Sequence, residues 1–256
     1  MKARIAALAL SFCLFFAGFA AIQHGAQGQI PAISQPLLGK GIPPTFSFRT
    51  SRANTSVGST TYSETTVDIG TADASRIVLV CITGTAVGAS TFSSATIDGV
   101  SATVAKQNTG ATRGLAVLMT AAVPANHTTA TISYTNSISL VRASMGVWAT
   151  YNLLSATPTT TALANTTTSG QSQSINMNIA PGALAFGCSY DNGDLGSPPP
   201  ITWTGFSSSS GDYTQSPAGD GNSGASYLST VTSSPRTFTG AWTNSSQGSG
   251  VGAVFN

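Results

Sequence analysis

Charged side chains are scarce in this sequence. Of its 256 residues, 7% are charged and the formal net charge is +2, whereas about 25% of the residues in a soluble domain are usually charged. A nucleic-acid-binding surface needs lysines and arginines clustered on one face. Intrinsic disorder combines low hydrophobicity with high net charge, and this chain is 41% hydrophobic. These features argue against nucleic acid as a partner and indicate a folded, almost uncharged protein.

The groups that perform acid–base and nucleophilic chemistry are also few. The chain has two histidines, His24 and His127, and a single glutamate, Glu64. A Ser-His-Asp triad would depend on His127, which lies in a polar turn, and no G-x-S-x-G motif is present. Glycoside hydrolysis needs two placed carboxyl groups, and neither a Walker A loop nor Cys/His zinc spacing occurs. We therefore expect no catalytic residues and no enzymatic activity.

The cysteines leave two interpretations open. Cys81 and Cys188 lie in the middle of apolar segments, each on the same alternating face as its large apolar neighbours. A secreted protein can join two such residues in a disulfide, but only where their geometry allows it. We favour two buried thiols, with the disulfide as the alternative.

The N-terminus has the pattern of a secretory signal. Lys2 and Arg4 precede an apolar run over residues 5–22. Residues 1–26 are therefore predicted to be a signal peptide, with an uncleaved apolar anchor or a buried assembly arm as alternatives. Residues 27–45 contain several prolines and glycines, which predict an extended linker. We expect an extracellular protein that contacts a membrane only through this first segment, if the segment is not cleaved.

Beyond residue 45 the sequence alternates between strand and turn patterns. Residues 75–83 (SRIVLVCIT) form a continuous β-branched and apolar run, which is typical of a strand buried on both faces. The Asp98-Gly99 pair predicts a type I′ hairpin. Further strands are expected over 114–121 and 128–135. The long apolar segment 139–152 is rich in Ser, Thr and β-branched residues, which favour a strand over a helix.

These patterns recur with a period near 107 residues. The segment ALAFGCSY around Cys188 resembles the segment around Cys81, and residues 134–137 (YTNS) match residues 242–245 (WTNS). The elements recur in the same order, which indicates duplication rather than a shared composition.

The repetition predicts a duplicated all-β domain. We place this domain at 46–256, with half-repeats over about 75–152 and 182–256 and a connector over 153–171. Strands with one apolar face bury it by packing two sheets together. The expected architecture is an antiparallel β-sandwich with jelly-roll or Greek-key connections, and tandem sandwiches are the alternative.

One glycine-rich stretch after Tyr190 contains candidate binding residues. Converging loops there could hold calcium, which takes oxygen ligands from carboxylates, although aspartates also simply form turns. The candidate calcium ligands are Asp191, Asp194, Asp212 and Asp220. The same stretch has aromatic residues that would serve either a sugar-binding surface or the core, namely Tyr190, Trp203, Phe206 and Tyr213. No cofactor other than calcium is expected.

The ordered segments SRIVLVCIT, ATIDGVSATV, GLAVLMTAAVP, TISYTNS and APGALAFGCSYDNG resemble uncharacterised β-sandwich proteins encoded by phages and prophages of proteobacteria. The resemblance covers roughly residues 60–256. It implies a decoration, fibre or tail-appendage role on a virion surface and supplies no catalytic residue. The signal-like N-terminus departs from the usual pattern of those proteins and favours a secreted or surface-anchored protein.

We therefore predict a non-catalytic structural or attachment protein of a virion or a bacterial cell surface. The alternative is a secreted, lectin-like carbohydrate-binding module with glycans as partners. Strand edges with few charges have little protection against pairing with other edges. For this reason we expect a homo-oligomer or an assembly with other surface proteins.

Overall fold

The computed structural model describes residues 42–55, 58–108, 113–166, 173–192, 201–208, 211–215, 221–229, 236–241 and 247–256. Every regular element in these residues is a β-strand, and the strands pair in antiparallel fashion. The prediction of an all-β antiparallel protein is therefore confirmed. The segment 1–26 and most of the linker 27–45 lie outside the described residues. In the described part of the chain, no helix could cross a membrane.

The described residues form sixteen strands. Their bounds are β1 (Thr45–Asn54), β2 (Ser59–Asp68), β3 (Ile77–Ala86), β4 (Phe92–Ile97), β5 (Val100–Ser101), β6 (Thr103–Gln107), β7 (Gly114–Ala122), β8 (Thr129–Tyr151), β9 (Thr160–Thr166), β10 (Gln173–Met177), β11 (Leu184–Asp191), β12 (Thr202–Thr204), β13 (Tyr213–Gln215), β14 (Gly221–Leu228), β15 (Arg236–Ala241) and β16 (Gly248–Phe255). We call residues 45–151 the N-terminal half and residues 160–255 the C-terminal half.

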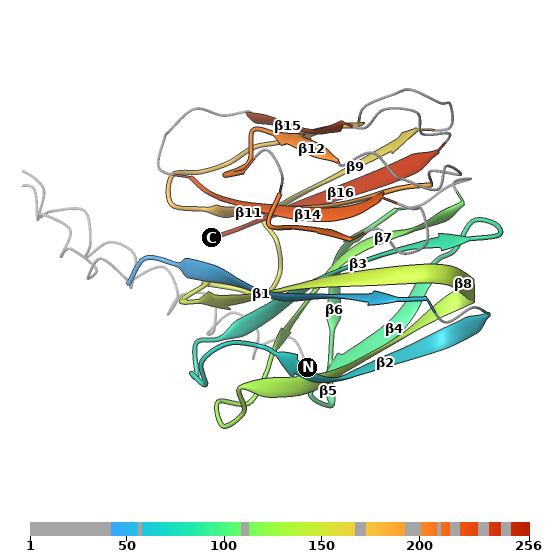
Figure 1. Ribbon diagram of the computed structural model, residues 1–256. Coiled ribbons are helices and arrows are strands. Elements are labelled where there is room, and N and C mark those ends of the chain that lie inside the picture. The colour runs from blue at the N-terminus through green and yellow to red at the C-terminus, as the bar shows by residue number, and fades with distance from the viewer. Residues whose placement is uncertain are drawn as a thin grey trace, which may run out of the picture. The chain divides into compact units, whose positions relative to one another are not determined.

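The long strand β8 organises the N-terminal half. Its first part, through Asn136, pairs with β4 and with most of β2. Its second part, from Leu140 onward, pairs with β1 and β3, and β3 continues the sheet to β7 and β6. One eight-stranded sheet therefore bends over itself, so that β2, β4 and β5 form a layer against β1, β3 and β7 (Figure 1).

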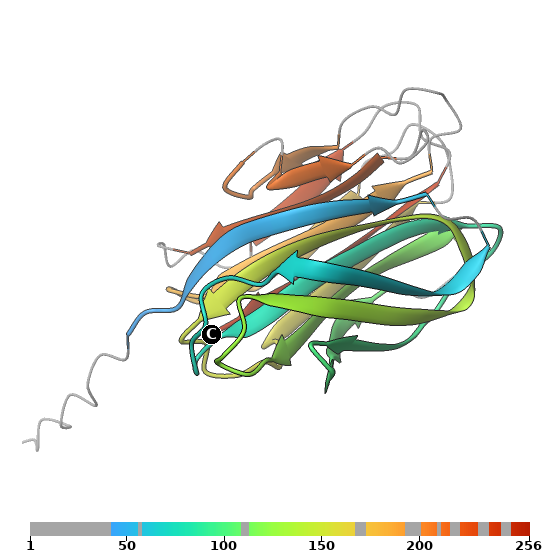
Figure 2. The same cartoon turned by 60° about the horizontal axis from the view of Figure 1, so that its bottom comes forward.

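The C-terminal half has two separate sheets. A five-stranded sheet has the order β13-β14-β11-β16-β9, and a three-stranded sheet has the order β10-β15-β12. Figure 1 shows β12 and β15 above the five-stranded sheet, and that sheet above β1, β3 and β7 of the N-terminal half. Residues 42–256 are therefore built from four layers of strands. Figure 2, turned by 60°, shows β1 running beside β8 at the edge of its layer.

Apolar side chains fill all three spaces between the layers. The first core lies inside the N-terminal half, the second lies between the two inner layers, and the third lies inside the C-terminal half. β3 supplies two of these cores, with Val78 and Val80 on one face and Leu79 and Cys81 on the other. A fully buried Val or Leu side chain contributes roughly 1.5–3 kcal/mol relative to exposure. The apolar run around Cys81, which was predicted to be a strand buried on both faces, is therefore confirmed as one in β3.

The predicted hairpin and the predicted long strand are both present. Asp98 and Gly99 have φ angles of 54° and 77°, the positive values that a type I′ turn requires. They join Ile97 of β4 to Val100 of β5, which face each other across the turn. Segment 139–152 is a strand up to residue 151, where β8 ends.

The predicted boundaries miss several strands. β1 and β2 precede residue 75, where the first half-repeat was expected to begin, and β9 occupies the expected connector 153–171. These strands consist mainly of Ser, Thr and Asn beside single apolar residues. Such edge strands have one exposed face, so they lack the apolar run that marks a buried strand.

Candidate functional site

The aromatic residues predicted to bind sugars lie mostly in the cores. Tyr190, Trp203 and Tyr213 are no more than 6% exposed, so none of them presents a ring face to solvent. Trp203 donates from Nε1 to Oγ of Ser223 at 2.7 Å. Phe206 is half-buried and packs against Trp203, with 5.0 Å between the ring centroids. Of the two roles left open for these residues, the three buried rings therefore have the core one. Tyr190 and Tyr213 lie in an inner layer, and Trp203 of the outer strand β12 faces the five-stranded sheet, whereas Thr202 and Thr204 beside it are exposed.

The aspartates predicted to bind calcium do not come together where they are described. The side chain of Asp212 accepts hydrogen bonds from Nε1 of Trp148 and Oγ of Ser226. Ser226 pairs with Phe186 on β11, whereas Asp191 lies at the far end of that strand. The five residues from Phe186 to Asp191 span about 16 Å of strand. The carboxylates of Asp212 and Asp191 are therefore too far apart to share an ion. Asp194 and Asp220 lie outside the described residues.

No group of three or more His, Cys, Asp or Glu side chains suited to a metal occurs among the described residues. The carboxyl of Asp212 instead bridges the two halves. Burial raises its pKa above the ordinary value, and the hydrogen bonds from Ser226 and Trp148 oppose this effect.

Cys81 and Cys188 form a disulfide between the two inner layers, with 5.8 Å between their Cα atoms. The sequence leaves two buried thiols and a disulfide as interpretations, and we favoured the thiols. The structure has the disulfide. Oη of Tyr213 donates to Sγ of Cys81 at 2.9 Å. Each cysteine lies mid-strand on the face that meets the other half, and the stacking of the inner layers brings the two together.

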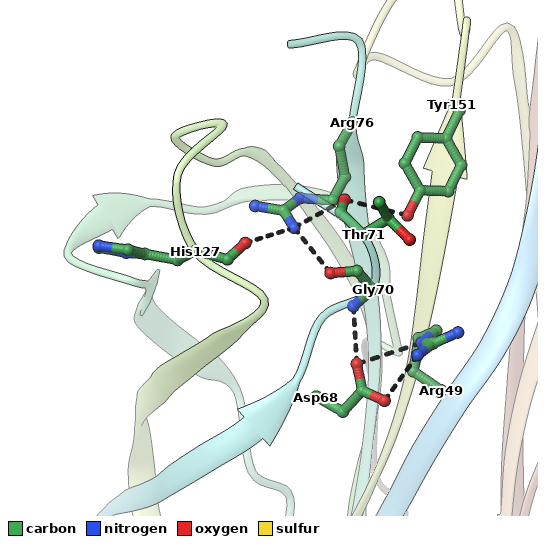
Figure 3. Close-up of polar contacts among 7 residues, drawn as sticks. All are labelled: Arg49, Asp68, Gly70, Thr71, Arg76, His127 and Tyr151. Carbon is green, nitrogen blue, oxygen red and sulfur yellow. Dashed lines mark hydrogen bonds and ion pairs between the residues drawn. The ribbon is translucent and has the colours of Figure 1, made fainter. Parts of the chain in front are cut away.

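A polar cleft lies at one end of the N-terminal half, beside Arg49 and Asp68. Arg49 is the extra residue of a bulge in β1, where the register with β8 shifts between Phe48 and Thr50. A bulge turns a side chain away from the regular alternation of its strand. Nε and Nη2 of Arg49 donate to the two carboxylate oxygens of Asp68, at 3.2 and 2.7 Å (Figure 3).

Asp68 is held from a second side by the loop that follows β2. The backbone N–H of Gly70 donates to its Oδ1 at 2.8 Å. Burial acts to raise the pKa of Asp68, but the hydrogen bonds from Arg49 and Gly70 outweigh it and keep the pKa below the ordinary value. The hydrogen bond from Arg49 to Asp68 raises the pKa of Arg49 in turn. Asp68 is therefore a carboxylate, which only accepts hydrogen bonds.

Gly70 allows this loop to pack closely on β8. Its φ is +85°, and a Cβ atom there would lie 2.6 Å from Cβ of Ala149 and 2.7 Å from Oη of Tyr151. Any side chain would therefore displace the tyrosine. Tyr151 uses its hydroxyl to donate to the carbonyl of Thr71 at 3.2 Å.

Arg76 lies beneath the loop and is 1% exposed. Its Nη1 donates to the carbonyls of Gly70, Thr71 and His127 at 3.0, 3.0 and 2.7 Å, and its Nη2 donates to the carbonyl of Pro124 at 2.8 Å. Figure 3 shows the guanidinium between the loop after β2 and the backbone of His127. Arg76 therefore ties two loops together through four carbonyl oxygens.

His127 itself is a surface residue of this region. Its Nδ1 contacts Oδ2 of Asp98, and its side chain is 49% exposed. The ring points away from Arg76 and the loop after β2 (Figure 3). Its contribution to the region is its carbonyl group, which needs no particular side chain.

The cleft has a volume of about 420 Å³ and is lined by Arg49, Asp68, Gly70, Thr71, Thr128 and Thr129. Its chemistry is that of hydrogen bonding, with one carboxylate, one guanidinium and three threonines. No lining residue is a histidine or a cysteine.

The sequence gives a weak signal for this cleft. Arg49 is one of two arginines in a strand made mainly of Ser, Thr and Phe, and Asp68 stands two residues before a glycine at the end of another strand. The two are 19 residues apart, and they meet because β1 and β2 both pair with β8. Only the register of those pairs, including the bulge, brings the side chains together.

Comparison of the chain with protein-family models, with curated proteins and with solved structures finds no match.

Proposed function

We propose that this chain is a non-catalytic structural or attachment protein that acts outside the cytoplasm, on a virion or a bacterial cell surface. The observation that carries the proposal is the disulfide between Cys81 and Cys188. Disulfides persist in secreted proteins and at virion and cell surfaces, and they are rare in the cytosol. The signal-like pattern of residues 1–26 agrees with the same destination.

The use of aromatic side chains also supports a structural role. Trp148 of the N-terminal half packs edge to face on Phe186 of the C-terminal half, with 5.6 Å between ring centroids. Tyr213 stacks on Phe48 across the same space, at 5.7 Å. Such pairs add about 0.5–1.5 kcal/mol beyond the area that they bury. Large rings therefore serve cohesion between the halves.

The proposal includes a finer description of the fold, in which each half is one copy of a jelly roll. The order β6-β7-β3-β8-β1 in the N-terminal half corresponds to β13-β14-β11-β16-β9, and β2-β8-β4 corresponds to β10-β15-β12. In both halves the chain crosses between two facing sheets in the same order, and one pair of consecutive strands, β6-β7 or β13-β14, stays in one sheet. Repeated crossing between two facing sheets supports jelly-roll connections.

The register supports the same correspondence. Cys81 on β3 pairs with Leu118 on β7 and Gly146 on β8. Cys188, which follows Cys81 by 107 residues, pairs with Gly224 on β14 and Val251 on β16. An experimental structure whose halves do not superpose strand for strand would contradict the duplication.

The proposal also includes assembly into a homo-oligomer or with other surface proteins. β9 is the edge strand of an inner layer, and its sequence TTALANT has no charged residue. An uncharged edge leaves backbone groups open to pairing with another strand. Sedimentation velocity over a range of concentrations is expected to show species larger than the monomer, and a monomer at every concentration contradicts this part of the proposal.

The location is tested on the native protein. Cell fractions, medium and any purified particles are probed for the chain, and the mass of its N-terminus and the state of Cys81 and Cys188 are measured in each. We expect the oxidised protein in the envelope, the medium or the particle. A chain that is found reduced in the cytosol would refute the proposal.

The alternative function, a secreted carbohydrate-binding module, receives no support from the residues first expected to carry it. Tyr190, Trp203 and Tyr213 are buried, and sugar recognition through them would require the cores to open. Recognition of sugars by this chain therefore needs a different site.

A further inference from the structure

Four charged residues lie at one end of the N-terminal half. Asp68, Asp73 and Arg76 fall within nine residues of sequence, and Arg49 joins them through its ion pair. In a chain with 7% charged residues, this is a marked concentration. Arg76 is buried, and its two terminal nitrogens donate to backbone carbonyls. Arg49 and Asp68, in contrast, have side chains that are 32% and 42% exposed, so both reach the solvent in the cleft.

The geometry fixes both groups before any ligand arrives. Two hydrogen bonds hold the guanidinium of Arg49 against the carboxylate of Asp68. The N–H of Gly70 holds the same carboxylate from another side. The loop that supplies Gly70 is fastened from below by Arg76. A preformed polar site of this kind loses little conformational entropy on binding.

The lining determines the class of ligand. Arg49 and Asp68 cancel each other's charge, so neither an anion nor a cation meets a net opposite charge. Threonines at 71, 128 and 129 complete the wall, with no large apolar side chain among the lining residues. A volume of about 420 Å³ lies within the usual range of small-molecule sites, roughly 300–1,000 Å³. A neutral molecule with several hydroxyl groups matches these walls.

We propose that this cleft binds a neutral saccharide, with Asp68 accepting a hydrogen bond from one ring hydroxyl and Arg49 donating to its neighbour. This inference rests on the proposed attachment function and names the chemistry that the attachment recognises. The low pKa of Asp68 keeps it an acceptor near neutral pH, which suits a hydroxyl donor.

The C-terminal half contains a natural control for this site. A second cleft, of about 360 Å³, lies beside the start of β9, the turn after β10 and the end of β16, and is lined by Thr159, Thr160, Asn178, Ile179, Ala180, Pro181 and Asn256. By strand order this is the place that corresponds to the first cleft. It has similar size and no charged residue, so the charged pair is what distinguishes the two clefts.

The test is saturation-transfer-difference NMR on the purified full chain. The probes are the methyl glycosides of mannose, galactose and fucose, N-acetylglucosamine, and an oligosaccharide of whichever sugar responds. Asp68→Ala and Arg49→Gln are compared with Asn178→Ala in the second cleft. We expect at least one probe to bind the native chain, and its affinity to fall about tenfold or more in the first two variants, since each removes a charge-assisted hydrogen bond. The Asn178→Ala variant keeps the native affinity.

Three results would overturn the inference. These are binding of none of the probes to the native chain, equal affinity in the Asp68→Ala and Arg49→Gln variants, or equal loss in the Asn178→Ala variant. The thermal midpoint of each variant shows whether it folds, and Asp68→Asn provides a milder variant if alanine does not. A stronger response from the oligosaccharide than from the monosaccharide indicates a surface polysaccharide as the source. If the saccharide inference fails, the proposed cellular location still stands, because fractionation tests that location separately.

Discussion

The connections that lead into the central strands β3 and β11 differ between the two halves. Between β2 and β3 the N-terminal half has an eight-residue loop whose carbonyls surround the buried guanidinium of Arg76. Between β10 and β11 the C-terminal half has a shorter turn, in which the N–H of Ala183 donates to the carbonyl of Ala180. Pro181 and Gly182 occupy the central positions of that turn, as expected for type II. Arg76 and Ala183 each stand directly before their central strand.

The comparison shows what the charged loop adds. A Pro-Gly turn is stabilised by its own backbone geometry and needs no neighbouring side chain. The longer loop depends on Arg76, and in return it presents Asp68, Gly70 and Thr71 along a cleft. One connection is therefore stabilised by its own backbone, and the other carries polar groups on a fixed frame.

The largest effect is expected where the halves are joined. The double variant Cys81→Ala and Cys188→Ala removes a disulfide that closes a span of 107 residues, and a loop of that size corresponds to about 4–5 kcal/mol in the chain-entropy description. Urea unfolding should show a loss within about 2–5 kcal/mol. The native chain under a reductant is the control and should approach the same midpoint. An unchanged midpoint would mean that packing alone holds the halves together.

Replacement of Arg76 tests the loop of the N-terminal half. In Arg76→Met four carbonyls lose a charged donor in a buried place, and we expect a loss of about 3 kcal/mol. The matched variant in the C-terminal half is Pro181→Ala in the exposed turn, for which a loss below about 1 kcal/mol is expected because only the backbone preference of proline is removed. Chemical denaturation measures both, and equal losses would remove the distinction between the two loops.

Asp212 tests the contact between the halves through pH. Burial raises its pKa, so the folded chain disfavours its charged form, and the cost appears as the pH rises from the ordinary value of 3.8 through the higher folded value. Asp212→Asn keeps an acceptor for Trp148 and carries no charge. We expect the variant to melt a few degrees above the native chain at pH 7, of the order of 1 kcal/mol, and to lose this advantage below pH 3.8. A difference in melting temperature between the variant and the native chain that does not change with pH would contradict the raised pKa of Asp212.

The smallest effect is expected at the exposed ion pair. Asp68→Asn should cost less than about 1 kcal/mol, because ion pairs open to solvent are weak. The folded pKa of Asp68 lies below its ordinary value of 3.8, so the stabilisation is present above that value and is lost as the pH falls through the folded pKa. Thermal melts at several pH values and salt concentrations measure the difference. Asn178→Asp is the reciprocal change, and a gain in stability from it would show that the second cleft accepts charge equally well.

Much of the fold follows from local sequence patterns. The apolar run around Cys81 has the length and composition of a strand covered on both faces, and Asp98-Gly99 has the residues that positive φ angles require. These features depend only on neighbours in sequence. β9 escapes the same analysis because an edge strand of threonine, alanine and asparagine has no such pattern.

The site and the disulfide depend on distant residues. Arg49 faces Asp68 because of a bulge and of two separate pairings with β8, and no periodicity of the sequence encodes that register. Tyr213 stands in a glycine- and serine-rich segment that suggests a loop, but stacking of a second pair of sheets buries it. Four layers are a property of the assembled halves rather than of any segment.

The bond between the two central strands also decides how the chain responds to mechanical load. If the protein is pulled from its two ends, force reaching residue 81 passes directly to residue 188, and the intervening chain, a sequence separation of 107, is shielded from extension. At about 3.3–3.6 Å per residue this withholds roughly 350–390 Å of contour length. Single-molecule stretching should release that length only after reduction, so the oxidised chain would behave as a short tether suited to a surface exposed to flow.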